Sequence, residues 1–178
     1  MDEFKTYSHT PPHLYRSGAK YFITASAYKA QKLFTNAVKK YLLSSIIKSC
    51  SNHNFILEDW VILDNHYHIM VEHFGEKVEL DKFINEIHKF TALFIKKQNI
   101  EIKEKHIFSN YWDSCITFEK SYFNRLHYIY INPIKHKYVK NPVDYDWCSY
   151  KIRYKEMPEY CDELMKKYPC DRINVYDI

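Results

Sequence analysis

The run Leu63-Asp64-Asn65-His66-Tyr67-His68-Ile69-Met70-Val71 places two histidines, one residue apart, at the start of an apolar segment. Side chains alternate between the two faces of a β-strand, so His66 and His68 point to the same face. Their Cα atoms then lie roughly 6.6 Å apart, a gap that one divalent metal ion can bridge between two imidazoles. The opposite face, which begins with Tyr67, is predicted to pack into a core.

A His-x-His pair also has a simpler interpretation. The chain contains 10 histidines in 178 residues, so such a pair is common by chance. Taken by itself, the pair is more often an exposed strand face than a set of metal ligands. The metal interpretation therefore depends on a second element further along the chain.

Composition and length are those of an ordinary soluble domain. Hydrophobic residues make up 46% and charged residues 27% of the chain. We expect one domain over residues 1–178, with an N-terminal arm over 1–20 and a C-terminal extension of unassigned role over 151–178. No apolar run approaches the length of a membrane span, and the first residues lack the apolar stretch of a signal peptide. A cytoplasmic protein without membrane association is expected.

Cysteine and glycine usage exclude several classes of site. The five cysteines are scattered and form no C-x-x-C pair, which favours reduced thiols over a thiolate zinc site. Gly18 and Gly75 are the only glycines, so the glycine-rich phosphate loop and the dinucleotide-binding turn are both excluded. The net charge of +4 permits nucleic-acid binding without requiring it.

Hydrophobic patterning outward from the two histidines predicts an α+β fold. Helices are expected at about 32–50 and 79–98, and strands at 21–28, 55–63, 66–73 and within 107–118. Asp64-Asn65 suits a tight turn, so the second and third strands should be antiparallel. The order strand, helix, strand, strand, helix, strand predicts the ferredoxin-like arrangement, with two helices on one face of a four-stranded antiparallel sheet. The other face is expected to be free for a ligand.

Regular structure is weaker outside this unit. A third helix is expected at about 121–131. Pro158 suits the first turn of a short helix that continues to Lys167. The arm over 1–20 is predicted to be irregular, and the chain from Tyr150 onward to be less regular.

The predicted third helix carries Tyr128 and Asn132, which are four residues apart and share a helix face. A phenol beside an amide can present a nucleophile next to a third metal ligand. Pro133 disfavours helical backbone angles at Asn132, so the pair is expected at the end of the helix. A tyrosine packed on the helix flank is the alternative interpretation.

A resemblance to a known family is carried by Asn65-His66-Tyr67-His68 together with Tyr128-Ile129-Tyr130-Ile131-Asn132-Pro133-Ile134-Lys135-His136. In order, these segments resemble the single-tyrosine HUH transposases of insertion sequences, and most closely their REP-associated branch. The resemblance covers about residues 10–150. The chain departs from the pattern at Asp64, where a proline is common, and at Cys148, where a serine is common. Further matching segments are Pro12–Tyr15, Tyr21–Thr24, Tyr111–Asp113 and Trp147–Tyr150.

The resemblance implies a reaction as well as a ferredoxin-like fold with an added helix that carries the tyrosine. His66, His68 and Asn132 would bind one Mg²⁺ or Mn²⁺, and Tyr128 would be the nucleophile. The tyrosine would become joined to a 5′ phosphate and release a free 3′ hydroxyl. The implied substrate is single-stranded DNA with a hairpin. Relatives include monomers and homodimers, so both states stay open.

Two basic clusters are candidates for DNA contact. Lys82, Lys89 and Lys96 recur at seven-residue intervals and share one helix stripe, although a solvated helix face is the alternative. The favoured cluster follows the predicted nucleophile and consists of Lys135, His136, Lys137 and Lys140.

Two other functions stay open. A non-catalytic nucleic-acid-binding domain would use the same sheet, but the glycine-containing signature of RNA-recognition modules is missing. A hydrolase that uses metal-bound water would keep the metal ligands and leave Tyr128 without a role.

Overall fold

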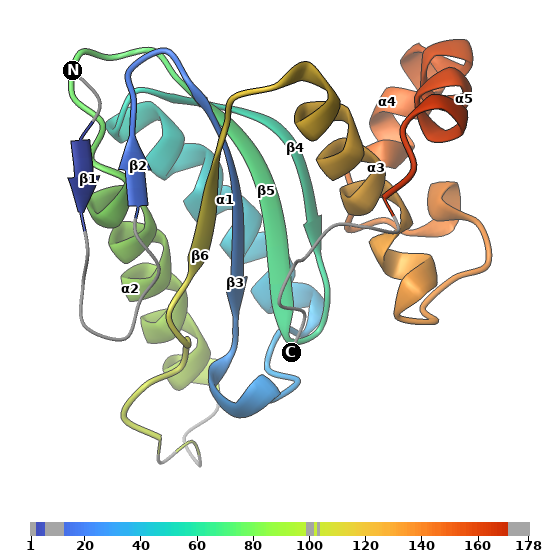
Figure 1. Cartoon of the computed structure of the whole chain (residues 1–178). Coiled ribbons are helices and arrows are strands. Elements are labelled where there is room, and N and C mark those ends of the chain that lie inside the picture. Colours follow the sequence, from blue (N-terminus) through green and yellow to red (C-terminus); the bar gives the residue numbers. More distant parts are fainter. Residues whose placement is uncertain (1–2, 6–12, 99–101, 103, 171–178) are drawn as a thin grey trace.

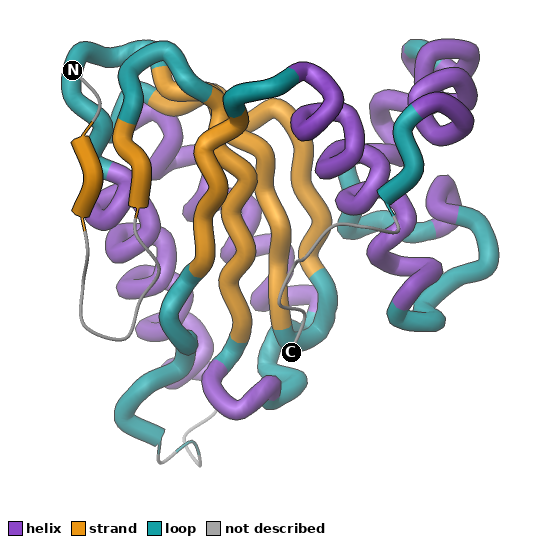
Figure 2. Tube along the Cα trace, in the orientation of Figure 1, coloured by secondary structure: helices purple, strands orange, loops and turns teal. Residues whose placement is uncertain are grey.

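A curved four-stranded antiparallel sheet forms the centre of the molecule (Figures 1 and 2). The computed structural model describes residues 3–5, 13–98, 102 and 104–170. The strands follow the order β4-β5-β3-β6, and each neighbouring pair is antiparallel. This is the ferredoxin-like order, which confirms the fold prediction. The strands are β3 (Lys20–Ser26), β4 (Phe55–Ile62), β5 (His66–His73) and β6 (Trp112–Ile116).

Two helices, α1 (Asn36–Asn52) and α2 (Leu80–Gln98), lie behind the sheet in Figure 1. Their apolar stripes pack on the sheet face formed by alternate residues such as Tyr21, Ile23 and Tyr67, as the period-two pattern predicts. Helix α1 begins later than expected because Thr35 caps it, its Oγ1 accepting a hydrogen bond from the Val38 backbone N–H at 3.4 Å.

The turn between β4 and β5 has the predicted form and is fastened to α1. The Leu63 backbone N–H donates to the His66 carbonyl at 2.8 Å, which closes the turn. The Lys39 ammonium lies 2.7 Å from Asp64 Oδ1. Burial acts to raise the pKa of the Asp64 carboxyl, but this ammonium more than offsets it, and the pKa is lowered. The start of β5, where the two histidines lie, is therefore held by the turn hydrogen bond and by the ion pair with α1.

A third helix, α3 (Glu119–Lys135), packs on the opposite face of the sheet. Leu126 and Ile129 of α3 form a second core with Val61 of β4 and Met70 of β5. The expectation that this face is free is therefore wrong for the β4–β5 half of the sheet. Val61 and Met70 are fully buried because a second apolar layer covers them.

Helix α3 runs four residues beyond its predicted end and contains Pro133 in its last turn. Proline cannot donate the backbone hydrogen bond that the Ile129 carbonyl would accept in a regular helix. The Cys148 thiol donates to that carbonyl instead, at 3.7 Å. This replacement lets the helix continue past Pro133, so that Asn132 lies inside the helix and not beyond its end.

The segment after α3 runs along the free edge of β4. The Ile62 N–H donates to the Trp147 carbonyl and the Ser149 N–H donates to the Trp60 carbonyl, both at 2.9 Å. Two helices follow, α4 (Tyr150–Glu156) and α5 (Pro158–Lys167). Helix α5 has its predicted bounds, whereas α4 was expected to be less regular. Residues 171–178 of the predicted extension lie outside the described residues.

A buried carboxylate ties these C-terminal elements to the sheet. Asp59 of β4 is fully buried and lies 2.6 Å from Arg153 Nη2 of α4. It also accepts hydrogen bonds from the Ser149 hydroxyl at 2.9 Å and from the Tyr130 hydroxyl of α3 at 3.0 Å. One charged group thus fixes β4, α3 and α4 relative to one another.

Part of the N-terminal arm is regular. β1 (Glu3–Lys5) and β2 (His13–Tyr15) form an antiparallel pair beside α2 in Figure 1, so the prediction of an irregular arm is wrong there. Pro12, which belongs to one matching segment, lies outside the described residues. Within the described ranges, no helix has both the length and the apolar character needed to cross a membrane.

Candidate active site

The two histidines of β5 are buried between the sheet and α3. His66 is 2% exposed and His68 is 0% exposed, which rules out the interpretation of an exposed strand face. Their ring centroids lie 5.1 Å apart, so the two imidazoles share one side of the sheet as the strand pattern predicts.

A hydrogen bond orients each imidazole. His66 Nδ1 lies 2.8 Å from Asn65 Oδ1, and His68 Nδ1 lies 2.8 Å from Thr24 Oγ1. Thr24 is the direct cross-strand neighbour of His68 in the β3–β5 register. Such partners fix the tautomer and the orientation of a metal-binding histidine and assign coordination to Nε2. The positions of Asn65 and Thr24 are therefore those expected of supporting residues.

Helix α3 brings three polar side chains alongside the two histidines. The Tyr128 ring centroid lies 5.3 Å from that of His68, and the His136 ring centroid lies 4.9 Å from that of His66. Asn132 lies midway between Tyr128 and His136 at four-residue steps, which places it on the same helix face. The predicted residues from β5 and α3 are therefore neighbours in space, although some sixty residues separate them in the chain.

Asn132 is unusual because it is fully buried and unsatisfied. Its side chain is 0% exposed, and neither Oδ1 nor Nδ2 has a hydrogen-bond partner within the described part of the chain. Buried amides are almost always hydrogen-bonded, so an exception calls for an explanation such as an absent ion or ligand.

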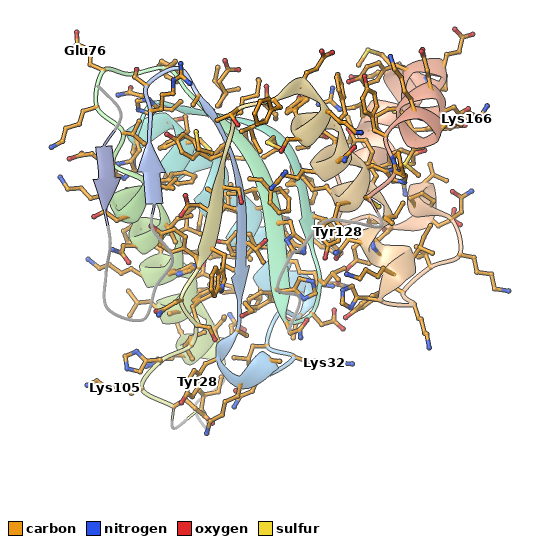
Figure 3. The ribbon with its side chains drawn as sticks, viewed as in Figure 1. Tyr28, Lys32, Glu76, Lys105, Tyr128 and Lys166 are labelled. Carbon is orange, nitrogen blue, oxygen red and sulfur yellow. The ribbon has the colours of Figure 1, made fainter. Side chains whose placement is uncertain are left out.

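The Tyr128 side chain is held from several sides. Figure 3 shows it between the strands and α3, near the middle of the molecule. Its ring makes an edge contact with Phe22 at 6.3 Å, and Phe22 in turn stacks on His68 at 5.6 Å. The Lys135 ammonium donates a hydrogen bond to the Tyr128 hydroxyl at 3.0 Å. Tyr128 is only 3% exposed, so its hydroxyl lies in a buried environment beside this ammonium.

The basic residues predicted to contact DNA fall into two separate regions. Lys135 and His136 contact the site itself, and Lys137 and Lys140 are exposed just beyond the end of α3. The other two, Lys82 and Lys89, lie on α2 behind the sheet, away from Tyr128. Lys82 also pairs with Glu79 at 2.8 Å.

Tyr130 is the nearest alternative nucleophile, and its environment is different. It is fully buried, and its hydroxyl donates to Asp59. Burial and the neighbouring carboxylate raise the pKa of the Tyr130 phenol. These contacts give Tyr130 a structural role, as its offset of two residues from Tyr128 on the helix suggests.

The predicted metal ligands combine two histidines with an amide and include no carboxylate or thiolate. Among the described residues, no group of three or more His, Cys, Asp or Glu side chains is arranged to hold a metal ion. The predicted set contains two histidines and an asparagine, so its third member lies outside those residue types.

Comparison with known proteins identifies the family. Residues 16–132 match the sequence profile of the family described as "Transposase IS200 like". The chain belongs to this transposase family. The transposase is also 26% identical over 152 residues to the REP-associated tyrosine transposase of Escherichia coli (strain K12), with 84% of this chain and 83% of that protein covered.

A solved structure supports the fold of the transposase. It is described as a REP-associated tyrosine transposase bound to a REP hairpin. It matches with a TM-score of 0.67 and 24% sequence identity, and the match covers 100% of this chain and 94% of that chain. The relatives are named tyrosine transposases, and the chain is an enzyme of this class.

Proposed function

We propose that this transposase is a metal-dependent endonuclease and strand transferase acting on single-stranded DNA, with Tyr128 as its nucleophile. The observation that carries the proposal is the position of Tyr128 beside His68, one helical turn from the buried amide of Asn132. Tyr128 and both histidines lie together within one chain, which supports a site formed inside a single subunit.

The donor set suits a divalent cation. His66 and His68 would bind through Nε2 and Asn132 through Oδ1, and the ion would satisfy the buried amide oxygen that has no partner within the described chain. Two imidazoles and a carboxamide oxygen fit Mn²⁺, and Mg²⁺ would use the same oxygen with added waters. When bound, such an ion withdraws negative charge from the non-bridging oxygens of a phosphodiester.

The side chains around Tyr128 account for the chemical step. The Tyr128 oxygen attacks phosphorus, a bond forms between them, and the bond from phosphorus to the 3′ oxygen breaks. The phenolic proton passes to water, and the departing 3′ oxygen takes a proton from water to become a hydroxyl. Lys135, already 3.0 Å from the phenol oxygen, would stabilise the negative charge that develops there as the proton leaves.

The product would be a 5′-phosphotyrosine that stores the energy of the broken bond. Attack by a 3′ hydroxyl on this phosphotyrosine reverses the step, so strand transfer needs no external energy source. Because a relative with the same fold is described as bound to a REP hairpin, we propose that a hairpin beside the single strand positions the substrate.

A covalent-adduct assay tests the proposal. The protein is incubated with a panel of labelled hairpin oligonucleotides carrying single-stranded flanks, in Mn²⁺, in Mg²⁺ or in EDTA. We expect an adduct that survives denaturing electrophoresis, requires the metal and disappears in Tyr128→Phe. Tyr130→Phe is the matched control and should retain the adduct, because its hydroxyl bonds Asp59 and not the substrate.

The other outcomes identify the competing functions. Cleavage without an adduct that persists in Tyr128→Phe would favour a hydrolase that uses metal-bound water. Hairpin binding with no cleavage in any metal would favour a non-catalytic nucleic-acid-binding domain.

A further inference from the structure

Arg125 lies one helical turn before Tyr128 on α3 and contacts Phe22 of β3. Its guanidinium carbon is 5.8 Å from the ring centroid of Phe22. The same Phe22 ring contacts both Tyr128 and His68. Arg125 therefore borders the candidate active site, although neither the sequence pattern nor the proposed mechanism assigns it a role.

The charge of Arg125 is only partly compensated. The side chain is half-buried, and its Nε is buried without a hydrogen-bond partner in the described ranges. Its described hydrogen bonds run from Nη1 to the Ser121 carbonyl, at 3.3 Å, and to the Ser121 hydroxyl. No carboxylate of the described chain lies within ion-pair distance of Arg125, whereas the similarly half-buried Arg153 lies 2.6 Å from Asp59.

The partly desolvated Arg125 guanidinium lowers the stability of the fold unless an anion binds to it. Burial lowers the pKa of the Arg125 guanidinium, which reports the loss of water around its charge. A desolvated cation is ordinarily paired, because an uncompensated charge away from water is strongly unfavourable. The planar guanidinium offers several N–H donors in a geometry that matches two oxygens of one phosphate.

We propose that Arg125 is a positioning residue that binds a backbone phosphate of the substrate strand. The proposal rests on the proposed function, since it places this phosphate beside the one that Tyr128 attacks. One helical turn, about 5 Å, separates the two residues along α3. We therefore expect the phosphate held by Arg125 to lie at or near the bond that is cleaved.

Binding to fluorescein-labelled (dT)15 at several salt concentrations provides the first test, because it requires no cleavage. Arg125→Gln should weaken binding about tenfold. It should also make the slope of log K against log salt shallower by about 0.7, the value for one phosphate contact on a single strand. Lys48→Gln, an equal charge change at an exposed position of α1, should leave both quantities unchanged. Arg125→Lys should keep the salt slope, because it keeps the positive charge. It should bind less tightly, because an ammonium cannot make the bidentate contact of a guanidinium.

A thermal-unfolding control separates binding from packing. If Arg125 only packs on Phe22, Arg125→Gln lowers the melting temperature and leaves the salt slope unchanged, which overturns the proposal. If Arg125→Gln fails to fold, the Arg125→Lys variant still tests the proposal. Unchanged affinity of this variant for (dT)15 would contradict a bidentate contact.

A methylphosphonate scan then locates the phosphate on a hairpin that the wild-type enzyme cleaves. We expect one position, at or next to the cleaved bond, where a neutral methylphosphonate lowers the adduct yield of the wild type. At that position the same substitution should not lower the adduct yield of Arg125→Gln any further. Equal losses for both proteins at every position would overturn the proposal while leaving the role of Tyr128 intact.

Discussion

The side chain of Asn132 is fully buried, and neither of its amide atoms is hydrogen-bonded within the described chain. A buried polar group in this state lowers the stability of the fold, typically by about 1–3 kcal/mol. The backbone around it is also demanding, because Pro133 follows it inside a helix. Selection for stability alone would favour an apolar residue here, which supports the proposal that the Asn132 oxygen binds a metal ion.

Replacing this amide should therefore stabilise the metal-free protein. We expect Asn132→Leu to raise the free energy of unfolding in EDTA by about 1–3 kcal/mol, measured by urea denaturation. The same variant should lose the increase in melting temperature that Mn²⁺ gives the wild type, because a ligand that binds only the folded state stabilises it.

Thr91 supplies a matched control for Asn132. Its hydroxyl is also buried without a partner in the described residues, but on α2, on the other side of the sheet. Thr91→Val should stabilise the protein as well and keep the full response to Mn²⁺. If Asn132→Leu destabilises the metal-free protein or keeps the Mn²⁺ response, Asn132 is not a metal ligand.

Helix α3 carries the proposed nucleophile, so the contacts that hold this helix set the accuracy of the proposed site. The Cys148 thiol caps the carbonyl that Pro133 leaves without a donor, and Asp59 binds Tyr130 on the same helix. Asp59 also binds Arg153 of α4, so the chain after α3 folds back to fix the helix against β4. Through Asp59, Tyr130 and Arg153 thus hold the helix that carries Tyr128.

Breaking the Asp59–Arg153 pair should destabilise the whole domain. Arg153→Met leaves a buried carboxylate without its cation, and we expect a loss of about 3–5 kcal/mol in the free energy of unfolding. Asp59→Asn in the Arg153→Met background should recover part of this loss, because the uncompensated charge is removed. A double-mutant cycle by urea denaturation measures the coupling, and additive effects would show that the pair is not a unit.

At the scale of the whole molecule, the lysines predicted to contact DNA lie on two opposite sides of the sheet. Lys137 and Lys140 lie beyond the end of α3, on the side of Tyr128, and Lys82 and Lys89 lie on α2 behind the sheet. We therefore propose that a DNA strand bound at Tyr128 contacts the first pair and not the second.

Two double variants with the same charge change test this arrangement. We expect Lys137→Gln/Lys140→Gln to weaken hairpin binding several-fold and to make its salt dependence shallower, since each phosphate contact contributes about 0.7–0.9 to the slope. Lys82→Gln/Lys89→Gln should change hairpin binding much less. Equal losses in the two double variants would place the DNA on both sides of the sheet and contradict this account.

Local patterns predict the parts of the fold that depend on near neighbours in the chain. The alternation after His66 gives β5 its observed bounds, and the four-residue step from Tyr128 to Asn132 predicts a shared helix face. Pro158 marks the start of α5. Helix α4 was missed because it is short and has one buried residue, Tyr150, which gives it no apolar stripe.

Contacts across strands and layers are what the sequence does not reveal. Thr24 supports His68 only because the β3–β5 register places them opposite each other. The role of Phe22 and Arg125 likewise depends on how α3 lies on the sheet. The sequence did contain one indication that a second layer packs on the sheet. The apolar run Trp60–Leu63 is typical of a strand buried on both faces, and α3 packs on the second face.

The most direct test of the account is to locate the DNA on the protein by mass spectrometry. Trypsin should release the peptide 126–135, which contains both Tyr128 and Tyr130. Fragment ions from backbone cleavage next to Ile129 contain only one of the two tyrosines, so they show which one is modified. With Mn²⁺ and a cleavable hairpin, we expect a nucleotide phosphate on Tyr128 that is absent in EDTA. A modified Tyr130, or cleaved DNA with an unmodified peptide, would contradict it.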